Sequence, residues 1–203
     1  MKGKGDLCRI ASMRLVLFIL ISVVLLSLAC APAAAPVAIG NKPVSVNGKS
    51  TNVAKERATV ELGEMSWAGF NGGVTKLKDL RGKAVILDFW ATNCPPCIEE
   101  IPHLIQLKQQ YGDDLVLVGL HVGDDEDRQK VPAFVEKLKI TYPLADPDSA
   151  LTDFVFQTNS AIPQTAVFDR NGAMVRKIVG FGPDIKIELD KAVEQAASST
   201  IQN

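Results

Sequence analysis

Residues 84–97 read Ala-Val-Ile-Leu-Asp-Phe-Trp-Ala-Thr-Asn-Cys-Pro-Pro-Cys, and this stretch decides the fold. Its first seven residues are almost all apolar, which is typical of a β-strand buried on both faces. A short polar turn then leads to Cys94 and Cys97, and a helical pattern continues to about residue 111. We therefore expect both cysteines at the junction of a buried strand and a helix.

The rest of the chain alternates strands and helices around this junction. A turn signal at residues 70–74 predicts an N-terminal hairpin, and Asn171-Gly172 predicts a second hairpin near the C-terminus. Helices that alternate with strands predict an α/β fold, with helices packed on a central sheet and a right-handed first crossover. Further strands are predicted at 59–62, 115–122, 142–145, 165–169 and 173–179, and further helices at 125–138, 148–156 and 184–197.

The N-terminus has the layout of an export signal. Lys2, Lys4, Arg9 and Arg14 precede an uncharged run at residues 15–29. At ~1.5 Å per residue, a helix of that length is shorter than the roughly 30 Å core of a bilayer. A cleaved secretory signal is therefore favoured over an uncleaved membrane anchor.

The signal ends in Leu26-Ser27-Leu28-Ala29-Cys30, which resembles a bacterial lipobox. Lipidation of Cys30 would make it the mature N-terminus, although Ser27 stands where Leu is usual and also fits ordinary signal cleavage. We expect a signal peptide at 1–29, a tether at 30–57 and a folded domain at 58–198. Residues 199–203 form a tail in this division. The tether prediction follows from the many Ala, Pro, Lys, Asn and Ser residues there.

Composition narrows the class of protein. Of the 203 residues, 22% are charged and 47% apolar, which suits a globular chain, and the net charge of −1 gives no attraction to nucleic acid. Two of the four cysteines, Cys8 and Cys30, lie in the signal or at its end. An exported domain held together by disulfides would carry more than the remaining pair. The pair therefore points to redox chemistry.

The spacing of Cys94 and Cys97 supports thiol–disulfide exchange. A thiolate at the first turn of a helix is stabilised by free N–H groups and by the helix dipole, which lowers its pKa. Cys94 would attack a substrate disulfide, and Cys97, one turn on, would resolve the mixed disulfide. Pro95 and Pro96 suit a helix start and stiffen the loop between the sulfurs.

Two other uses of the cysteines are weaker. A zinc site needs about four ligands, and the sequence offers only His103 and His121 beside this pair. We expect no metal. A purely structural disulfide would close a very short loop and add little stability.

Residues 88–97 resemble the active-site segment of thioredoxin-fold oxidoreductases. With the export signal and an insert after the first helix, the chain resembles the TlpA/ResA-like branch over residues 58–197. Pro102 and the turn at 169–172 match as well. The segment Ile162-Pro163-Gln164-Thr165 resembles the cis-proline segment that faces the dithiol. The resemblance implies a thioredoxin-like fold, with a central mixed β-sheet flanked by helices, an N-terminal hairpin and a central insert.

The resemblance also implies roles for residues around the dithiol. A cis Pro163 opposite Cys94 would leave the backbone of Ile162 free to pair with an extended substrate. Trp90 is expected to pack against the dithiol region and to contribute to substrate binding. Asn93 replaces an aromatic residue that is common before the first cysteine, so substrate choice is expected to differ.

Two acids are candidates for handling the proton of Cys97. Glu100 shares a helix face with Cys97, Ile101 and Leu104, so we expect it to be partly buried with a raised pKa. The resemblance links an acid at this position to dithiol reactivity. Asp88 matches the buried acid of thioredoxin, where TlpA/ResA-like proteins often carry Asn. The sequence leaves open which acid serves Cys97.

Other charged residues are expected in solvent. Glu99 is rotated away from the face of Glu100, and the acidic run at 124–127 resembles a solvated helix start. His103 and His121 receive no role.

These observations predict an extracytoplasmic, membrane-tethered thiol–disulfide oxidoreductase whose working group is the Cys94–Cys97 disulfide, without another cofactor. The resemblance favours a periplasmic lipoprotein that reduces protein disulfides, for example in cytochrome c biogenesis, with a membrane protein as electron donor. The alternatives are a disulfide-forming oxidant, a peroxiredoxin-like peroxidase and a copper-binding chaperone. Thr92-Asn93-Cys94 lacks the upstream proline of the peroxidase, and the chaperone needs a wider cysteine spacing.

Overall fold

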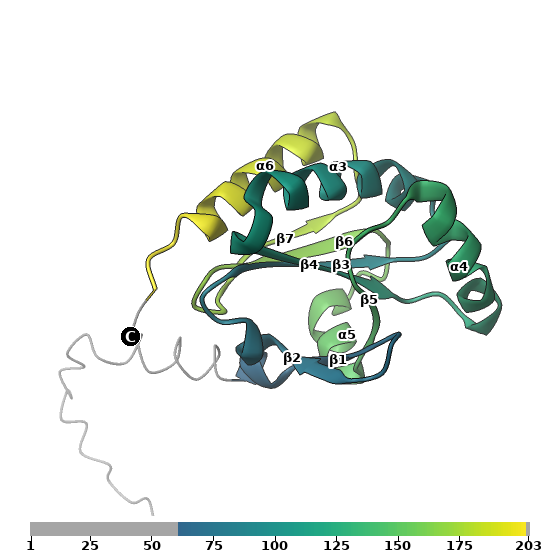
Figure 1. Cartoon of the computed structure of the whole chain (residues 1–203), viewed down its shortest axis with the longest axis horizontal. Coiled ribbons are helices and arrows are strands. Elements are labelled where there is room, and N and C mark those ends of the chain that lie inside the picture. Colours follow the sequence, from purple (N-terminus) through teal and green to yellow (C-terminus); the bar gives the residue numbers. More distant parts are fainter. Residues whose placement is uncertain (1–60, 202–203) are drawn as a thin grey trace, which may run out of the picture. The chain divides into compact units, whose positions relative to one another are not determined.

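A seven-stranded mixed sheet, in the order β2-β1-β5-β4-β3-β6-β7, organises the computed structural model (Figure 1). The structure describes residues 61–201, so the predicted signal peptide at 1–29 and the whole predicted tether at 30–57, with Cys30, lie outside the described residues. The strands are β1 (Ser66–Gly69), β2 (Val74–Lys76), β3 (Ala84–Trp90), β4 (Leu115–His121), β5 (Leu144–Pro147), β6 (Gln164–Phe168) and β7 (Met174–Val179).

Strand β3 lies inside the sheet, as its apolar sequence predicts. It pairs in parallel with β4 and antiparallel with β6, and all seven of its residues are buried. β4 continues in parallel to β5, while the β1–β2 hairpin joins β5 antiparallel. The central mixed sheet of a thioredoxin-like fold is therefore present.

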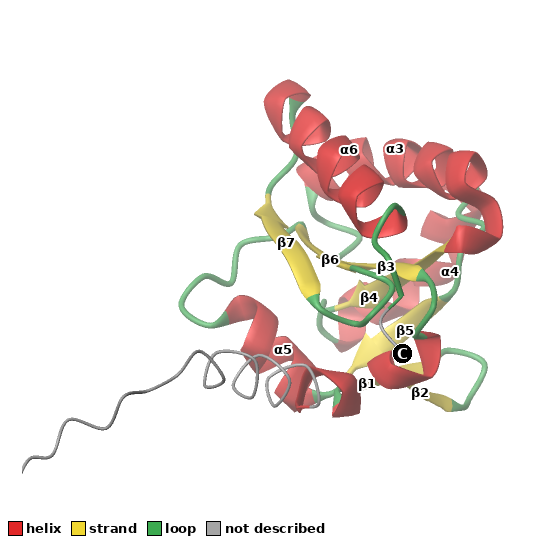
Figure 2. Ribbon diagram, turned by 90° about the vertical axis from the view of Figure 1, so that its left-hand side faces the viewer, coloured by secondary structure: helices red, strands yellow, loops and turns green. Residues whose placement is uncertain are grey.

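Within residues 65–201, four α-helices pack around this sheet. α3 and α6 cover one face and α5 lies on the other, as Figures 1 and 2 show from two directions. The face under α3 and α6 buries Ile101, Leu104 and Leu189, and the face toward α5 buries Phe89 and Leu151. The helices are α3 (Pro95–Tyr111), α4 (Asp125–Leu138), α5 (Ser149–Phe156) and α6 (Pro183–Ala197), with short 3-10 turns at Leu77–Leu80 and Gly112–Asp114.

The predicted elements are confirmed except near the N-terminus and at β5. The strand predicted at 59–62 is wrong for its described part, because residues 61–64 are helical. Glu61, Leu62 and Glu64 are all good helix formers, and a four-residue window was too short to show it. β5 begins two residues later than predicted, because its first residue, Leu144, pairs with Gly119 of β4 and its last, Pro147, pairs with Trp67 of β1.

Charged side chains mark both edges of the sheet. β2 has three residues and ends at Lys76, whose ammonium group lies 2.9 Å from the Glu64 carboxylate. At the other edge, β7 carries Arg176, which pairs with Glu188, and Lys177, which donates to the carbonyl of Val155. Charges on an edge strand discourage pairing with another chain.

Candidate active site

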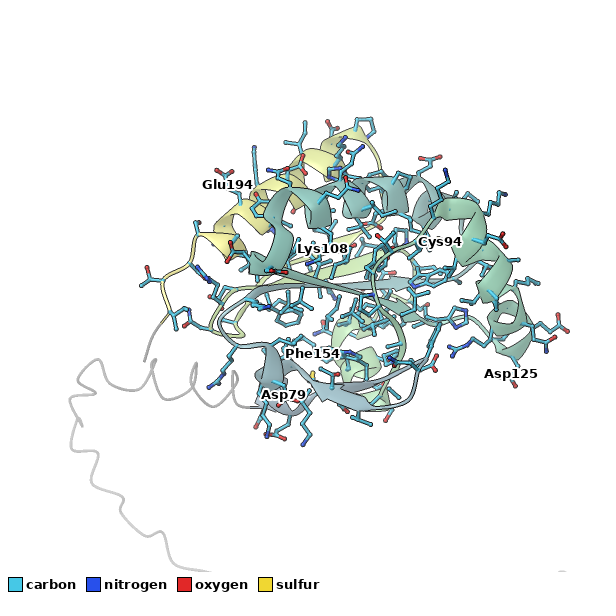
Figure 3. All side chains as sticks on the ribbon, viewed as in Figure 1. Asp79, Cys94, Lys108, Asp125, Phe154 and Glu194 are labelled. Carbon is cyan, nitrogen blue, oxygen red and sulfur yellow. A yellow bond between two sulfur atoms is a disulfide. The ribbon has the colours of Figure 1, made fainter. Side chains whose placement is uncertain are left out.

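Cys94 lies at the N-terminal end of α3, where Figure 3 labels it. It is the N-cap residue with an extended backbone, and its sulfur accepts the backbone N–H of Cys97 at 3.3 Å. The two sulfurs form a disulfide, with the Cα atoms 5.3 Å apart. After reduction, the same N–H and the helix dipole would stabilise a Cys94 thiolate.

The two cysteine residues differ in exposure to solvent. Cys94 is 6% exposed and Cys97 is 1% exposed. A bulky partner therefore has easier access to Cys94 than to Cys97. The geometry is therefore consistent with Cys94 as the attacking group and Cys97 as the resolving group.

The prolines of the loop occupy the first turn of α3. Pro95 and Pro96 stand at the first two helical positions, whose N–H groups would have no partner within the helix. Pro95 is exposed and Pro96 is half-buried, so both border the surface that a substrate would approach. Pro102 lies further along the same helix.

The segment before β6 faces the dithiol. The Ile162–Pro163 peptide bond is cis, and the carbonyl oxygen of Ile162 lies 3.5 Å from the Cys94 sulfur. Bonds from Gly180 N–H to the Pro163 carbonyl and from the Gln164 side chain to the Ala161 carbonyl hold this segment in place. The structure thus brings together two segments that are 68 residues apart in the chain.

Glu100 is fully buried on α3, one turn after Cys97. Its Oε1 accepts a 2.7 Å hydrogen bond from the hydroxyl of Thr165, the second residue of β6. Burial raises the pKa of Glu100 to about 7, against the opposing effect of the Thr165 hydrogen bond. A carboxyl with this pKa can take up or release a proton near neutral pH.

Asp88 lies beneath the same helix at the centre of β3. It pairs in register with Gly119 of β4 and Thr165 of β6, and it is 1% exposed. Burial, and then the charge of Glu100, raises the pKa of Asp88 well above its ordinary 3.8. The two acids thus disfavour each other's ionisation, so we call Asp88 and Glu100 the buried acid pair.

Trp90 forms the packing behind the dithiol. Its side chain has no exposed surface and belongs to the cluster that contains both cysteines. It stacks on Phe134 with ring centroids 5.1 Å apart and meets His121 edge-on at 5.4 Å. Pro95, Pro96 and Ile162 are accessible to solvent near the dithiol, whereas Trp90 is not, so the expected contact of Trp90 with substrate does not fit its burial.

The sequence did not predict a third buried acid near the dithiol. Asp127 was expected in solvent, but it is 2% exposed, and that prediction is wrong. Its carboxylate accepts the backbone N–H of Thr92 at 2.9 Å, the Thr92 hydroxyl, and His121 Nε2 at 2.8 Å. Burial alone would raise the pKa of Asp127, but these hydrogen bonds outweigh it and lower the pKa below its ordinary 3.8. The signal was the stripe Asp127, Val131, Phe134, which follows the inward face of α4.

Other expectations on charged residues are confirmed or extended. Glu99 is exposed, as expected. His103 is buried and lies 2.7 Å from the carboxylate of Asp190 on α6, so it joins two helices.

Within residues 61–201, no group of three or more His, Cys, Asp and Glu residues could hold a metal ion. None of the helices in this part of the chain is both long and apolar enough to cross a membrane.

Comparison with known proteins agrees with this geometry. Residues 59–177 match the AhpC/TSA family. The chain belongs to this family. It is 32% identical to the thiol-disulfide oxidoreductase YkuV of Bacillus subtilis, over 68% of this chain and 92% of that protein. It is also 32% identical to the thiol-disulfide oxidoreductase ResA of Bacillus cereus, over 54% of this chain and 62% of that protein.

A solved structure shows the same architecture. The thiol:disulfide interchange protein of the thioredoxin family from Chlorobium tepidum has a TM-score of 0.55 and 28% identity, covering 66% of this chain and 92% of that one. The family member described here is thus a thioredoxin-fold protein of the TlpA/ResA-like kind, and its enzyme class is thiol–disulfide oxidoreductase.

Proposed function

We propose that this protein reduces disulfides in other proteins outside the cytoplasm while tethered to a membrane by its N-terminus. The observation that carries the proposal is the position of Cys94, capped by the N-terminus of α3 and faced by the Ile162 carbonyl. Glu100, one turn after Cys97 on α3, and Asp88 on β3 add buried carboxyls that can take up the proton of Cys97.

The reaction follows from these positions. The Cys94 thiolate attacks a substrate disulfide, forms a mixed disulfide and releases one substrate thiolate. Cys97 gives its proton to the buried acid pair and attacks the Cys94 sulfur, which releases the second substrate thiolate. The substrate gains two electrons, and the Cys94–Cys97 disulfide forms. An electron donor, proposed to be a membrane protein, must then reduce this disulfide.

The direction of electron flow is tested by the reduction potential of the dithiol. We expect a value near or below roughly −230 mV, toward the thioredoxin end of the scale, for a reductant. Equilibration in a glutathione buffer, with thiol alkylation as the readout, measures it. A value near roughly −120 mV would make the protein a disulfide-forming catalyst and overturn the proposed direction.

The proposed tether rests on the sequence, with Cys30 as the lipid attachment site and cytochrome c biogenesis as one setting for such a reductase. Labelling of the full chain with a radioactive fatty acid in bacterial cells tests lipidation. Label should be lost in Cys30→Ala and retained in Cys8→Ala, a matched control because Cys8 lies within the signal. Equal labelling of both variants, or none in the parent chain, would exclude Cys30 as the attachment site.

A further inference from the structure

Several buried polar atoms around the buried acid pair have no hydrogen-bond partner among the described residues. Within residues 61–201, four buried atoms of this region have no hydrogen-bond partner: Asp88 Oδ1, Glu100 Oε2, Trp90 Nε1 and the Tyr142 hydroxyl. Two are acceptors when the carboxyls are ionised, and two are donors. A buried polar group without a hydrogen-bond partner costs free energy. Two donors and two acceptors in one buried region therefore need an explanation.

The register of the sheet places these atoms in one neighbourhood. Asp88 and Trp90 are two residues apart on β3 and so face the same side, which is the side of α3. Gly119 is the partner of Asp88 on β4. A Cβ atom at Gly119 would lie 2.9 Å from Trp90 Nε1 and 3.0 Å from Cε2 of Tyr142, which neighbours the carbon that bears the hydroxyl.

Tyr142 is also linked to both acids electrostatically. Burial, and then the charges of Asp88 and Glu100, raises the pKa of Tyr142 well above 10. The phenol therefore stays protonated and remains a donor at every pH at which the enzyme works. Its ring is 6% exposed, so bulk water does not replace the missing partner.

We propose that Tyr142 and Trp90 donate hydrogen bonds, through a bound water molecule, to the ionised form of the buried acid pair. The donors and carboxylate oxygens are further apart than a direct hydrogen bond, and one buried water typically makes two to four bonds to such groups. Tyr142 is then a positioning residue: it keeps the carboxylate ionised, and so able to take the Cys97 proton, down to a lower pH without touching substrate. The inference rests on the proposed role of Cys97.

The titratable and uncharged groups around the buried acid pair come from the following elements. α3 contributes Glu100 and Cys97, β3 contributes Asp88, and Tyr142 precedes β5. β4 and β6 face the pair with the uncharged Gly119 and Thr165. His121 meets the ring of Trp90 edge-on, and its own partner is the Asp127 carboxylate.

The test observes the reactions of Cys94 and Cys97 as two successive kinetic phases. The reduced protein is mixed with the aromatic disulfide DTNB in a stopped-flow instrument between pH 5 and pH 9. Attack by Cys94 releases the first coloured thiolate, and attack by Cys97 on the mixed disulfide releases the second. Only the second phase depends on loss of the Cys97 proton to the acid pair.

Tyr142→Phe should raise the pH midpoint of the second phase by about one unit, because a donor to the carboxylate is lost. At a fixed pH below the midpoint this slows the second phase about tenfold and leaves the first phase unchanged. Tyr111→Phe is the matched control, since Tyr111 lies at the far end of α3. Trp90→Phe should move the midpoint in the same direction while keeping a ring against Phe134.

Each outcome is decisive. An unchanged or lowered midpoint in Tyr142→Phe, with wild-type first-phase rates showing that the variant is folded, would overturn the inference and reduce Tyr142 to a space-filling ring. If Tyr142→Phe fails to fold, the Trp90→Phe midpoint decides in the same way. A wild-type protein without a second phase would instead contradict the role of Cys97 in the proposed function.

Discussion

Two buried acid centres flank the dithiol, and they behave in opposite ways. Asp127 is almost fully buried, yet it accepts bonds from Thr92 and His121, and its pKa is lowered. Asp88 and Glu100 are buried to the same extent, but each has an oxygen without a described hydrogen-bond partner, and the pKa of each is raised. Burial is the same in both places, and the number of donors decides whether the carboxyl keeps its charge or holds a proton.

The two acid centres are therefore suited to different roles. The Asp127 centre stays ionised and fixes the loop two residues before Cys94. The buried acid pair can change its protonation, as its proposed role at Cys97 requires. Four experiments test these different roles, and they are given in order of decreasing effect.

The largest effect concerns the dithiol that the two centres support. Cys94→Ser should abolish insulin reduction, and Cys97→Ser should accumulate mixed disulfides because the resolving thiol is gone. Non-reducing gels and mass spectrometry of the purified domain with a disulfide-bonded substrate measure the adduct. Adducts formed by Cys94→Ser and not by Cys97→Ser would reverse the assigned order and detach the acid pair from the resolving step.

Asp127→Asn should destabilise the fold by about 2–3 kcal/mol at pH 7, because charged hydrogen bonds to Thr92 and His121 are lost in a buried site. Because the folded-state pKa is lowered, this stabilisation is present above 3.8 and is lost as pH falls through the lower folded value. Urea unfolding at pH 7 and in acid should therefore show a gap to the wild type that narrows in acid.

Asp125→Asn is the control for that measurement. Asp125 is exposed in the same first turn of α4, as Figure 3 shows, and should change the unfolding midpoint little. If Asp127→Asn were as mild as Asp125→Asn, the loop before Cys94 would not depend on the Asp127 centre.

Glu100→Gln should have a smaller effect on stability, and of the opposite sign. The folded-state pKa of Glu100 is raised from 4.5 to about 7, so its stabilisation is present below pH 4.5 and is lost as pH rises through about 7. A Gln side chain does not ionise, so the variant should lack this decline and equal or exceed the wild type at pH 8. The pH dependence of thiol alkylation near neutrality should also change.

Glu99→Gln is the matched control, being the exposed neighbour on the same helix. Wild-type pH profiles of stability and alkylation in Glu100→Gln would leave Asp88 as the acid that titrates.

The smallest expected effect is on hydrogen peroxide. The Thr92 hydroxyl is engaged by Asp127 and is not free to orient a peroxide beside Cys94. We expect no peroxide turnover above that of a free thiol, either in the wild type or in Cys97→Ala, when peroxide consumption is followed. Sustained turnover by Cys94 alone would support the peroxidase alternative.

The sequence predicted correctly those features that depend on the residue pattern within one or two elements. The buried strand before Cys94, the helix after it and the burial of Glu100 all follow from spacing along one or two elements. Asp127 was misjudged because a run of four acids resembles a solvated helix start, and its donors come from β4 and the loop after β3. The position of Tyr142 against the acid pair depends on how β4 pairs with β5, which no local pattern shows.

The charged edge strands of the sheet, β2 and β7, discourage pairing with other chains. An open edge strand can pair with an extended backbone segment of another chain and seed aggregates. β2 offers three residues ending at Lys76, and β7 carries Arg176 and Lys177. In the proposed function, contact with a substrate protein is thereby left to the loop at Ile162, which lies beside the Cys94 sulfur.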